Sequence, residues 1–398
     1  MHPPGADVVL IRYGDIGVKS APVQRRMEAT LRENLSALLV DRGIEGDVTT
    51  ERTRLYIETA PDTIESATTS ATDAFGVVSA SPATRVDADL DTITSTLAEM
   101  APSVYQDGSF AVRARRAGPS DAHPFTSGDI ERDGGDRIWR AVEDDIDPQV
   151  DLDAPDRTFY VECRRDKAYI FLEKRTGPGG LPLRSQKPLV AMISGGIDSP
   201  VAAWFAMKRG SPVIPLYFDF GDFGGVDHVA RAEESITKLA RFAPNTDMRP
   251  RVVPAGPFAT ELVETVTSTR MLSLRRFMFA VANQVAAEYD AVGIVTGEAL
   301  GQKSSQTAAN LAVTDASSDL PVHRPLLAMD KQEIISHAKR IGTYAGATIP
   351  AGCNRIAPTR PSTAASLERV VAAEPPLEPW VDEAMAALEI FEPMIAQH

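Results

Sequence analysis

The stretch Pro188-Leu-Val-Ala-Met-Ile-Ser-Gly-Gly-Ile-Asp-Ser-Pro-Val-Ala-Ala-Trp204 decides the fold of the second half of this chain. Its apolar run, residues 189–193, predicts a buried parallel strand, and Pro200 stands where the first turn of a helix tolerates proline. Between strand and helix lie six mostly small or polar residues, 194–199. Glycines let backbone N–H groups approach an anion, and a helix N-terminus adds positive dipole. The stretch therefore predicts a phosphate site in a doubly wound α/β domain.

The order and spacing of residues in this loop indicate which kind of phosphate chemistry it serves. It lacks the Gly-x4-Gly-Lys-[Ser/Thr] pattern of nucleotide triphosphatases that cleave at the γ-phosphate. Ser194-Gly-Gly-Ile-Asp-Ser199 instead resembles the signature of the PP-loop ATP pyrophosphatases, with the adenine nucleotide alpha hydrolase-like fold. The resemblance implies that ATP adenylates a substrate and pyrophosphate is released. An ordinary tight turn between a strand and a helix is the plainer alternative.

Composition bounds the class of protein. A chain of 398 residues predicts two or three domains. No apolar run approaches the roughly 18–20 residues of a membrane span, and residues 1–5 do not resemble a signal peptide, so we expect a cytoplasmic protein with no membrane contact. Its two cysteines cannot form a disulfide framework or, alone, a four-thiolate metal site, and we assign no metal ligand. The formal charge of −14 does not exclude RNA, because salt screens long-range charge.

Ahead of the loop, hydrophobic periodicity predicts two small units. The first alternates strands and helices as in a ferredoxin-like α+β module, and the second has an arginine-rich strand followed by a hairpin. We expect strands at 8–13, 53–59, 109–116, 158–163 and 167–173, and helices at 23–40, 62–75, 90–100 and 130–146. The predicted organisation is an N-terminal ferredoxin-like domain at 1–78, a second domain at 79–176, a linker at 177–187 and the nucleotide domain at 188–398.

The second unit resembles a THUMP domain, an RNA-binding module. The matching text is Phe110-x-Val-Arg-Ala-Arg-Arg116, Phe125-Thr-Ser127 with Ile130-Glu-Arg132, and Asp166-Lys-Ala-Tyr-Ile170. Such a module needs positively charged side chains more than residues that recognise particular bases, because proteins recognise RNA helices mainly through shape, phosphate and 2′-hydroxyl contacts. For any single arginine, a solvated charged strand explains the residue equally well. The residues expected to contact RNA are Arg113, Arg115, Arg116, Lys174 and Arg175.

After the loop, further polar and aromatic groups follow predicted parallel strands. Tyr217 and Phe218 end a strand expected at 211–218, and Gly297 follows another strand, with Gln306 nearby. Ligands of open α/β sheets bind beyond the carboxyl ends of strands, so these residues are placed to wall a nucleotide, although core aromatics would look the same in isolation.

Charged residues and a cysteine complete the candidate site. Arg275 and Arg276 lie on a predicted helix and are candidate phosphate clamps, with the alternative that one of the pair simply faces solvent. Asp330 predicts a helix N-cap, and Lys331 in the first turn suits a bound anion better than the helix dipole. Cys353 lies in a loop with glycine and arginine, where cations lower a thiol pKa, although a buried, inert cysteine would explain an isolated case equally simply. Cys163 in a strand is assigned as buried and inert.

Four signals occur in one order along the chain and resemble those of the tRNA 4-thiouridine synthetase (tRNA sulfurtransferase) family, in a short form. They are Ser194-Gly-Gly-Ile-Asp-Ser199, Gly297-Glu-Ala-Leu-Gly-Gln-x-x-Ser-Gln-Thr307, Arg324-Pro-Leu-x-x-x-Asp-Lys-x-Glu-Ile334, and Cys353 with Arg360-Pro-x-Thr363. The resemblance covers nearly the whole chain, including Arg12-Tyr-Gly-Asp-Ile-Gly-Val-Lys19.

The resemblance implies an ATP-dependent enzyme, with Mg²⁺, in which O4 of uridine 8 of tRNA attacks the α-phosphorus of ATP and sulfur then displaces AMP. It assigns Asp198 and Lys331 to adenylation and Cys353 to sulfur handling. The residues that it places around ATP are Met192, Ile193, Ser194, Gly195, Gly196, Asp198, Ser199, Tyr217, Phe218, Arg275, Gly297 and Gln306.

Many family members carry a rhodanese-like domain, and we expect none after the acidic, apolar segment 380–395, which we expect to be helical. Sulfur is then expected as sulfide, or from a persulfide-bearing protein such as a cysteine desulfurase. The expected partners are this donor and tRNA, and the expected assembly is a homodimer. Two alternatives stay open: a PP-loop ligase or sulfurtransferase acting on a small molecule, such as the thiamine thiazole precursor, and a non-catalytic RNA-binding scaffold.

Overall fold

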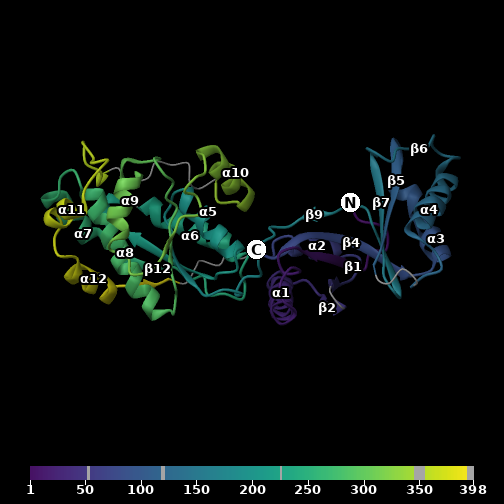
Figure 1. The fold of residues 1–398 in the computed structure, drawn as a ribbon, viewed down its shortest axis with the longest axis horizontal. Coiled ribbons are helices and arrows are strands. Elements are labelled where there is room, and N and C mark those ends of the chain that lie inside the picture. The colour runs from purple at the N-terminus through teal and green to yellow at the C-terminus, as the bar shows by residue number, and fades with distance from the viewer. Residues whose placement is uncertain (52–53, 118–121, 225, 345–354, 392–398) are drawn as a thin grey trace. The chain divides into compact units, whose positions relative to one another are not determined.

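The fold is given by a computed structural model, which describes residues 1–51, 54–117, 122–224, 226–344 and 355–391. Contacts divide the chain into two compact units, Met1–Gly180 and Leu181–His398, whose elements are labelled in Figure 1. Within the described ranges, no helix combines the length and apolar character needed to span a membrane.

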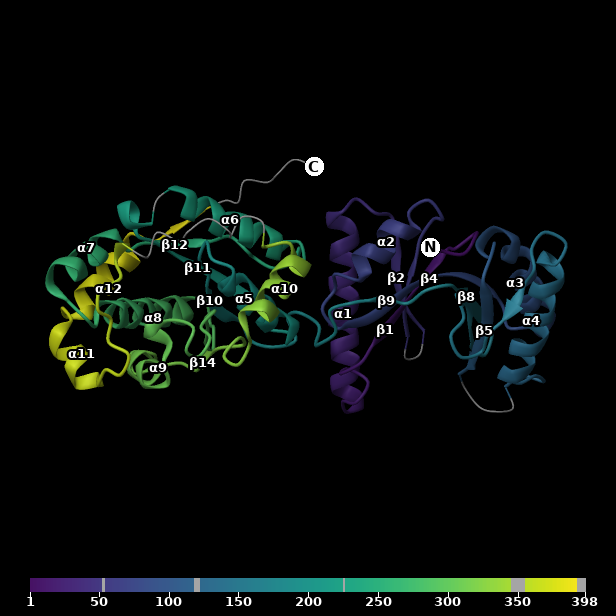
Figure 2. The ribbon, with the colours of Figure 1, turned by 90° about the horizontal axis from the view of Figure 1, so that it is seen from above.

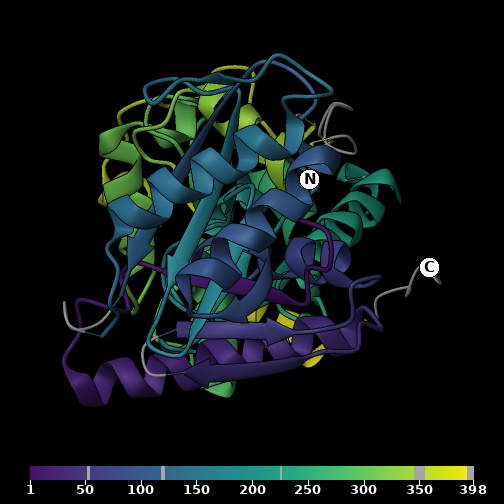
Figure 3. The same ribbon diagram turned by 90° about the vertical axis from the view of Figure 1, so that its right-hand side faces the viewer.

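The first unit begins with a ferredoxin-like module. Its elements are β1 (Val8–Tyr13), α1 (Ala21–Asp41), β2 (Asp47–Glu51), β3 (Arg54–Glu58), α2 (Ile64–Ala71) and β4 (Val77–Asp87). The strands pair antiparallel in the order β2-β3-β1-β4, and Figure 3 shows α1, in purple, lying alongside the strands of this module. The sequence did not predict β2, because this edge strand is polar and mostly exposed and so lacks an apolar alternation.

The same sheet continues into the second module. Its elements are α3 (Leu90–Val104), β5 (Ser109–Arg116), α4 (Ser127–Val142), β6 (Gln149–Val150), β7 (Arg157–Cys163), β8 (Lys167–Phe171) and β9 (Arg175–Thr176). The order runs on as β4-β8-β7-β5-β6, and the predicted hairpin is confirmed as antiparallel β7 and β8. Helices α3 and α4 pack on one face over a core that includes Phe110, Ile138 and Phe159. The boundary expected after residue 78 falls inside β4, so the two modules share one sheet.

The second unit is a doubly wound α/β domain. Its strands are β10 (Leu189–Met192), β11 (Val213–Asp219), β12 (Arg251–Pro254), β13 (Ile294–Val295), β14 (Val322–His323) and β15 (Glu389–Ile390). Their order is β14-β13-β10-β11-β12-β15, and all pairs are parallel except β12 with β15. The direction of winding reverses at β10, between β11 on one side and β13 on the other. A switch point of this kind opens a crevice at the carboxyl ends of the strands.

Helices cover both faces of this sheet. They are α5 (Asp198–Lys208), α6 (Val226–Ala240), α7 (Gly256–Thr265), α8 (Arg270–Glu288), α9 (Ala308–Asp315), α10 (Lys331–Ile341), α11 (Leu367–Ala373) and α12 (Leu377–Ala386). On one face, Phe258 and Phe277 from α7 and α8 pack with ring centroids 4.3 Å apart over Val190 and Leu216 of the sheet. Figure 2 shows α8 between the sheet and helices α9 and α11.

One predicted element is wrong at the C-terminal end. The helix expected at 380–395 ends with α12 at Ala386, and β15 follows. In β15, Glu389 and Ile390 pair with Val252 and Arg251 at the edge of the sheet. The local pattern could not show this, because the partner strand is more than a hundred residues earlier in the chain.

Candidate active site

The loop after β10 is held in a compact turn by its two serines. Ser194 N donates to Ser199 Oγ at 2.8 Å, and the two hydroxyl oxygens lie 3.0 Å apart. Gly196 N also donates to Ser194 Oγ at 3.4 Å. Asp198 then begins α5. The first turn of a helix carries N–H groups without intrahelical partners, so this turn presents donors and positive dipole to the crevice.

The loop after β13 lies directly against this turn. A Cβ added to Gly297 would sit 2.6 Å from Ser199 N and 2.7 Å from the carbonyl carbon of Asp198. No other residue can replace glycine at that distance without moving one of the two loops. The close approach brings two loops that are a hundred residues apart in sequence to the same point of the crevice.

A cavity of about 170 Å³ opens at the carboxyl ends of β10, β11 and β13. Its lining includes every residue predicted to contact ATP except Gly195. Those in the lining are Met192, Ile193, Ser194, Gly196, Asp198, Ser199, Tyr217, Phe218, Arg275, Gly297 and Gln306. Gly195 faces α6 instead, where an added Cβ would lie 3.1 Å from the His228 carbonyl oxygen and 3.2 Å from Arg231 Cβ.

The cavity also has walls that the sequence analysis did not assign. They are Phe220, His228, Met271, Leu274, Met278, Thr296, Lys303 and Ser305. Three of these lie on α8 with Arg275 at the spacing i, i+3, i+4, i+7, which is one face of a helix. This periodicity was present in the sequence and could have identified α8 as a wall of the site.

Gln306 has a buried side-chain oxygen at the wall of the cavity. Its side chain is buried, with 3% of its surface exposed, and its Oε1 has no hydrogen-bond partner among the described residues. The backbone is fixed, because Gly301 N donates to Gln306 O at 2.8 Å and Gln306 N donates to Lys303 O at 2.9 Å. A buried acceptor without a donor costs about 1–3 kcal/mol. A ligand that offers an N–H or O–H group at this wall of the cavity would remove that cost.

Asp198 and Lys331 meet at the edge of the cavity. Lys331 Nζ lies 2.7 Å from Asp198 Oδ1, although 133 positions separate the two residues. Lys331 begins α10, whose predicted N-cap is confirmed: Asp330 and Glu333 form a capping box. Lys331 therefore pairs with a carboxylate in this structure, and that carboxylate belongs to the loop 194–199.

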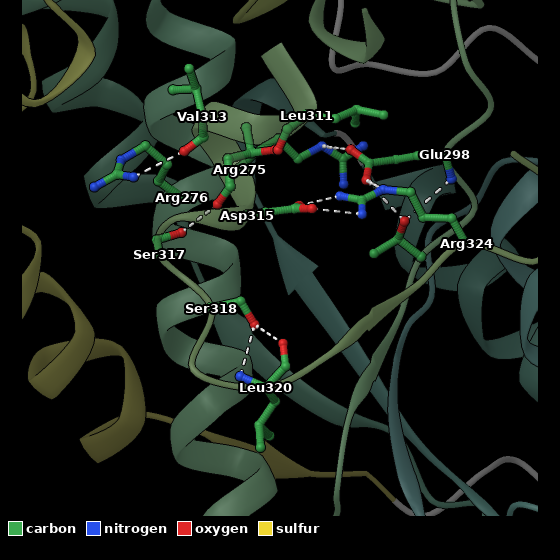
Figure 4. A network of polar contacts seen from close by, with 12 residues as sticks. Arg275, Arg276, Glu298, Leu311, Val313, Asp315, Ser317, Ser318, Leu320 and Arg324 are labelled. Atoms are coloured by element: carbon green, nitrogen blue, oxygen red, sulfur yellow. Dashed lines mark hydrogen bonds and ion pairs between the residues drawn. The ribbon is translucent and has the colours of Figure 1, made fainter. Parts of the chain in front are cut away.

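The two arginines of α8 have different surroundings (Figure 4). Arg275 lines the cavity, with its Nε 3.8 Å from Glu298 Oε1. Arg276 is buried against Glu374 at 3.0 Å and donates to the Val313 carbonyl oxygen at 3.1 Å. The prediction of a phosphate clamp is thus wrong for Arg276, because successive residues on a helix point about 100° apart. Burial raises the pKa of Glu374, and Arg276 opposes this rise.

The first unit carries a basic groove on the sheet. Arg113, Arg115 and Lys174 line it together with Arg12 and Tyr160. Lys174 Nζ lies 4.3 Å from the centroid of the Tyr160 ring, and burial together with the nearby arginines lowers the Lys174 pKa. The groove is open and combines cations with an aromatic face, a combination suited to nucleic acid.

Two of the predicted RNA-binding residues do not line this groove. Arg116 is absent from it because neighbouring residues of β5 point to opposite faces of the sheet. Arg175 instead pairs with Glu65 at 2.6 Å and with Glu173 at 2.7 Å.

A buried carboxylate supports the floor of the groove. Glu162 accepts from Arg12 at 3.4 Å, Arg54 at 3.0 Å and Arg164 at 2.7 Å. Three guanidinium groups on one carboxylate give this cluster a net positive charge, while Glu131 and Asp153 add two carboxylates to the lining of the groove. No local pattern in the sequence connects Arg12 of the groove lining, or Arg54 that pairs with Glu162, to this site, because they come from β1 and β3, far from the other groups along the chain.

Cys163 lies in the core of the first unit. Cys163 is fully buried, and burial raises the pKa of its thiol to about 11. Its thiolate is therefore scarce near neutral pH, in keeping with the inert assignment. Cys353 lies outside the described residues.

The fold and the site define a nucleotide-binding domain of the PP-loop type. In the sequence it follows a ferredoxin-like domain and a THUMP domain. Models of three families match the chain: the thiamine biosynthesis protein ThiI over residues 184–378, the THUMP domain over 87–173 and the ThiI ferredoxin-like domain over 8–81. A "Probable tRNA sulfurtransferase" of Halobacterium salinarum is 56% identical over 94% of each chain, and one of Methanosarcina acetivorans is 38% identical over 97% of this chain and 94% of its own. The chain belongs to the ThiI-type tRNA sulfurtransferase family.

Two solved structures resemble the whole fold. A 4-thiouridine synthetase in complex with RNA and bound ATP has a TM-score of 0.85 and 28% identity, covering 97% of this chain and 99% of its own. The protein PH1313 from Pyrococcus horikoshii has a TM-score of 0.66 and 25% identity, covering 84% of this chain and 99% of its own.

Replacing Gly297 by alanine is expected to destabilise the second unit by about 1–3 kcal/mol, because the added methyl group overlaps the backbone at Ser199. Urea unfolding of the full chain, followed by tryptophan fluorescence, measures the change. The matched control is Gly256→Ala, whose new Cβ makes only ordinary contacts at 3.5 Å. Equal stability of the two variants would contradict the close approach.

Proposed function

We propose that this protein is an ATP-dependent tRNA sulfurtransferase, which adenylates O4 of uridine 8 and replaces that oxygen with sulfur to give 4-thiouridine. The observation that carries the proposal is the cavity at the switch point, where the loop 194–199, Gln306 and the Asp198–Lys331 pair converge. The named relatives and the ATP-bound 4-thiouridine synthetase support this assignment.

In the first step, the uridine O4 attacks the α-phosphorus of ATP and the bond from that phosphorus to pyrophosphate breaks. Negative charge grows on the leaving pyrophosphate, so donors that are already in place stabilise the transition state. The loop 194–199 supplies backbone N–H groups and serine hydroxyls, and Arg275 supplies a guanidinium. Tyr217 and Phe218 wall the adenine, and the amide of Gln306 binds the nucleoside.

In the second step, a sulfur nucleophile attacks C4 of the base and the C4–O bond to the adenylate breaks. Adenylation is needed because the unactivated carbonyl oxygen would have to leave as hydroxide, whereas AMP is a far better leaving group. Cys353 is our candidate for the thiol that receives or attacks a persulfide. The sulfur comes from sulfide or from a persulfide-bearing protein such as a cysteine desulfurase.

The residues fit a Mg²⁺ ion that arrives with ATP. Mg²⁺ in nucleotide sites commonly takes one or two carboxylates together with substrate phosphates, and Asp198 offers one carboxylate in the lining of the cavity. Within the described ranges, no group of three or more His, Cys, Asp or Glu side chains could hold a metal ion unaided. When bound, Mg²⁺ supplies positive charge to the departing pyrophosphate.

The substrate RNA is proposed to bind the basic groove of the first unit. Arg113, Arg115 and Lys174 face it with Arg12, and contacts of this kind bind phosphates with little regard to base sequence. A cytoplasmic location, expected from the sequence, and a homodimer complete the proposal.

Exchanging Asp198 for asparagine is expected to lower AMP formation in the presence of unmodified tRNA by about 100-fold or more, since the loop loses the charge that faces Lys331. The assay measures AMP, pyrophosphate and 4-thiouridine, with tRNA binding followed separately. The control is Asp290→Asn, which removes the exposed ion pair between Asp290 and Lys187 in the same unit. Thiolation by the Asp198 variant at the normal rate would rule out the proposed site, and turnover without tRNA would favour a small-molecule ligase.

The variant Cys353→Ser is expected to keep tRNA-dependent AMP formation and lose 4-thiouridine, because adenylation precedes sulfur transfer. Cys163→Ala serves as the control, since the buried thiol has no assigned chemical role. Full thiolation by the Cys353 variant with a persulfide-bearing protein as donor would disprove a required role for this cysteine. Sulfide is not the donor for this test, because it can attack C4 directly without a thiol.

Truncating Arg115 to alanine is expected to weaken tRNA binding about 3- to 10-fold and to lower its salt dependence by about one phosphate contact. Filter binding at several salt concentrations measures both quantities. The matched control is Arg132→Ala in the same module, because Arg132 is exposed and pairs with Asp129 and Asp133 away from the groove. If both variants bind tRNA equally well, the groove is not the RNA site.

A further inference from the structure

Glu298 is a buried carboxylate next to the cavity that the proposed mechanism does not use. Only 1% of its surface is exposed. It follows Gly297, the residue that packs against the turn of α5. A carboxylate with so little water around it is costly unless it is paired and hydrogen-bonded, so its partners indicate what it does.

The two oxygens of Glu298 have different partners, as Figure 4 shows. Oε2 accepts a hydrogen bond from Arg324 Nε at 2.9 Å and another from Thr296 Oγ1 at 3.0 Å. Oε1 faces Arg275, whose Nε lies 3.8 Å away. That distance is an ion-pair contact and too long for a hydrogen bond. Arg275 is therefore held by charge, and no described residue accepts a hydrogen bond from its guanidinium.

The rest of the network keeps the carboxylate in place. The guanidinium of Arg324 also binds both carboxylate oxygens of Asp315 on α9. Burial alone would lower the Arg324 pKa, but Asp315 and Glu298 outweigh burial and raise it. The backbone is tied as well, because Thr296 N donates to the His323 carbonyl oxygen and Leu300 N to that of Leu327, both at 3.0 Å. Glu298 consequently has a fixed position from which to direct Arg275.

Arg276 and Glu374 provide the internal comparison. They form another buried arginine–glutamate pair at 3.0 Å, one residue further along α8. Arg276 does not line the cavity, so this pair can only support the fold. Arg275 lines the cavity and keeps 25% of its side chain exposed. The same kind of pair thus holds one arginine inside the protein and aims the other at the ligand space.

We propose that Glu298 is a positioning residue for the nucleotide, which holds Arg275 in the direction of the phosphates of ATP. The inference rests on the proposed function, because it requires ATP in this cavity. Replacement by glutamine keeps the volume and leaves one oxygen for Arg324 and Thr296. It also places an amide N–H₂ group beside Arg275, which repels the guanidinium instead of holding it.

The test compares ATP with adenosine, which has no phosphates, by calorimetric titration of the full chain without tRNA. Glu298→Gln is expected to bind ATP about tenfold more weakly and adenosine within about twofold of the unaltered protein, since a charge-assisted contact to phosphate is lost. Glu374→Gln is expected to leave the ratio of the two affinities unchanged. When Glu298→Gln is combined with Arg275→Gln, the double variant should lose as much ATP affinity as Arg275→Gln alone.

Three results would overturn the inference. Equal weakening of ATP and adenosine in Glu298→Gln would assign a general structural role, and so would fully additive losses in the double variant. Unchanged ATP affinity in Glu298→Gln would also overturn the inference, even if adenylation slowed. Should Glu298→Gln fail to fold, Glu298→Asp keeps the charge but withdraws it by one methylene, and a selective partial loss of ATP affinity is expected. If the unaltered protein binds no ATP, the proposed function itself fails.

Discussion

The close approach between Gly297 and the start of α5 is the constraint on which the site depends. A side chain at this position would lie 2.6 Å from the backbone of Ser199, so the strand β13 can deliver its loop to the crevice only with glycine there. That contact closes the cavity between two neighbouring parallel strands. It also fixes where Glu298 and Gln306 lie, because both follow Gly297 in the same loop region. The loop 194–199 alone would be an anion cradle open to solvent, and the second loop converts it into a pocket.

Two ion pairs lie at this pocket. Lys331 lies against Asp198 at 2.7 Å, and Arg275 faces Glu298 at 3.8 Å. Each pair joins a segment from the sheet crevice to a helix that starts elsewhere in the chain. Paired charges can be kept in a partly buried cavity without the cost of isolated ions. In the proposed site, a polyphosphate would meet cations whose directions are already set, which is the condition for electrostatic stabilisation of a transition state.

The sequence was most informative where function is local. The loop 194–199 could be recognised because strand, turn and helix start are contiguous, and the N-cap at Asp330 was predicted for the same reason. It was least informative where partners are distant. The pairing of β15 with β12 and the burial of Arg276 against Glu374 depend on contacts made about a hundred residues along the chain or further. The basic groove was foreseen on β5, but the arginines from β1 and β3 were not, because no local pattern connects them.

The sequence by itself determined which groups this protein can offer to chemistry: a loop of the kind that binds anions, a glycine-bearing second loop, basic residues on an early strand and one cysteine at position 353. Short motifs determine these features because they require particular residues at fixed spacing. Only the tertiary structure decided which of two adjacent arginines faces the cavity, that Lys331 meets Asp198, and that Glu298 lies behind Arg275. Those choices follow from the phase of α8 and from the way parallel strands bring their carboxyl ends together. Both are properties of the packed domain rather than of any segment.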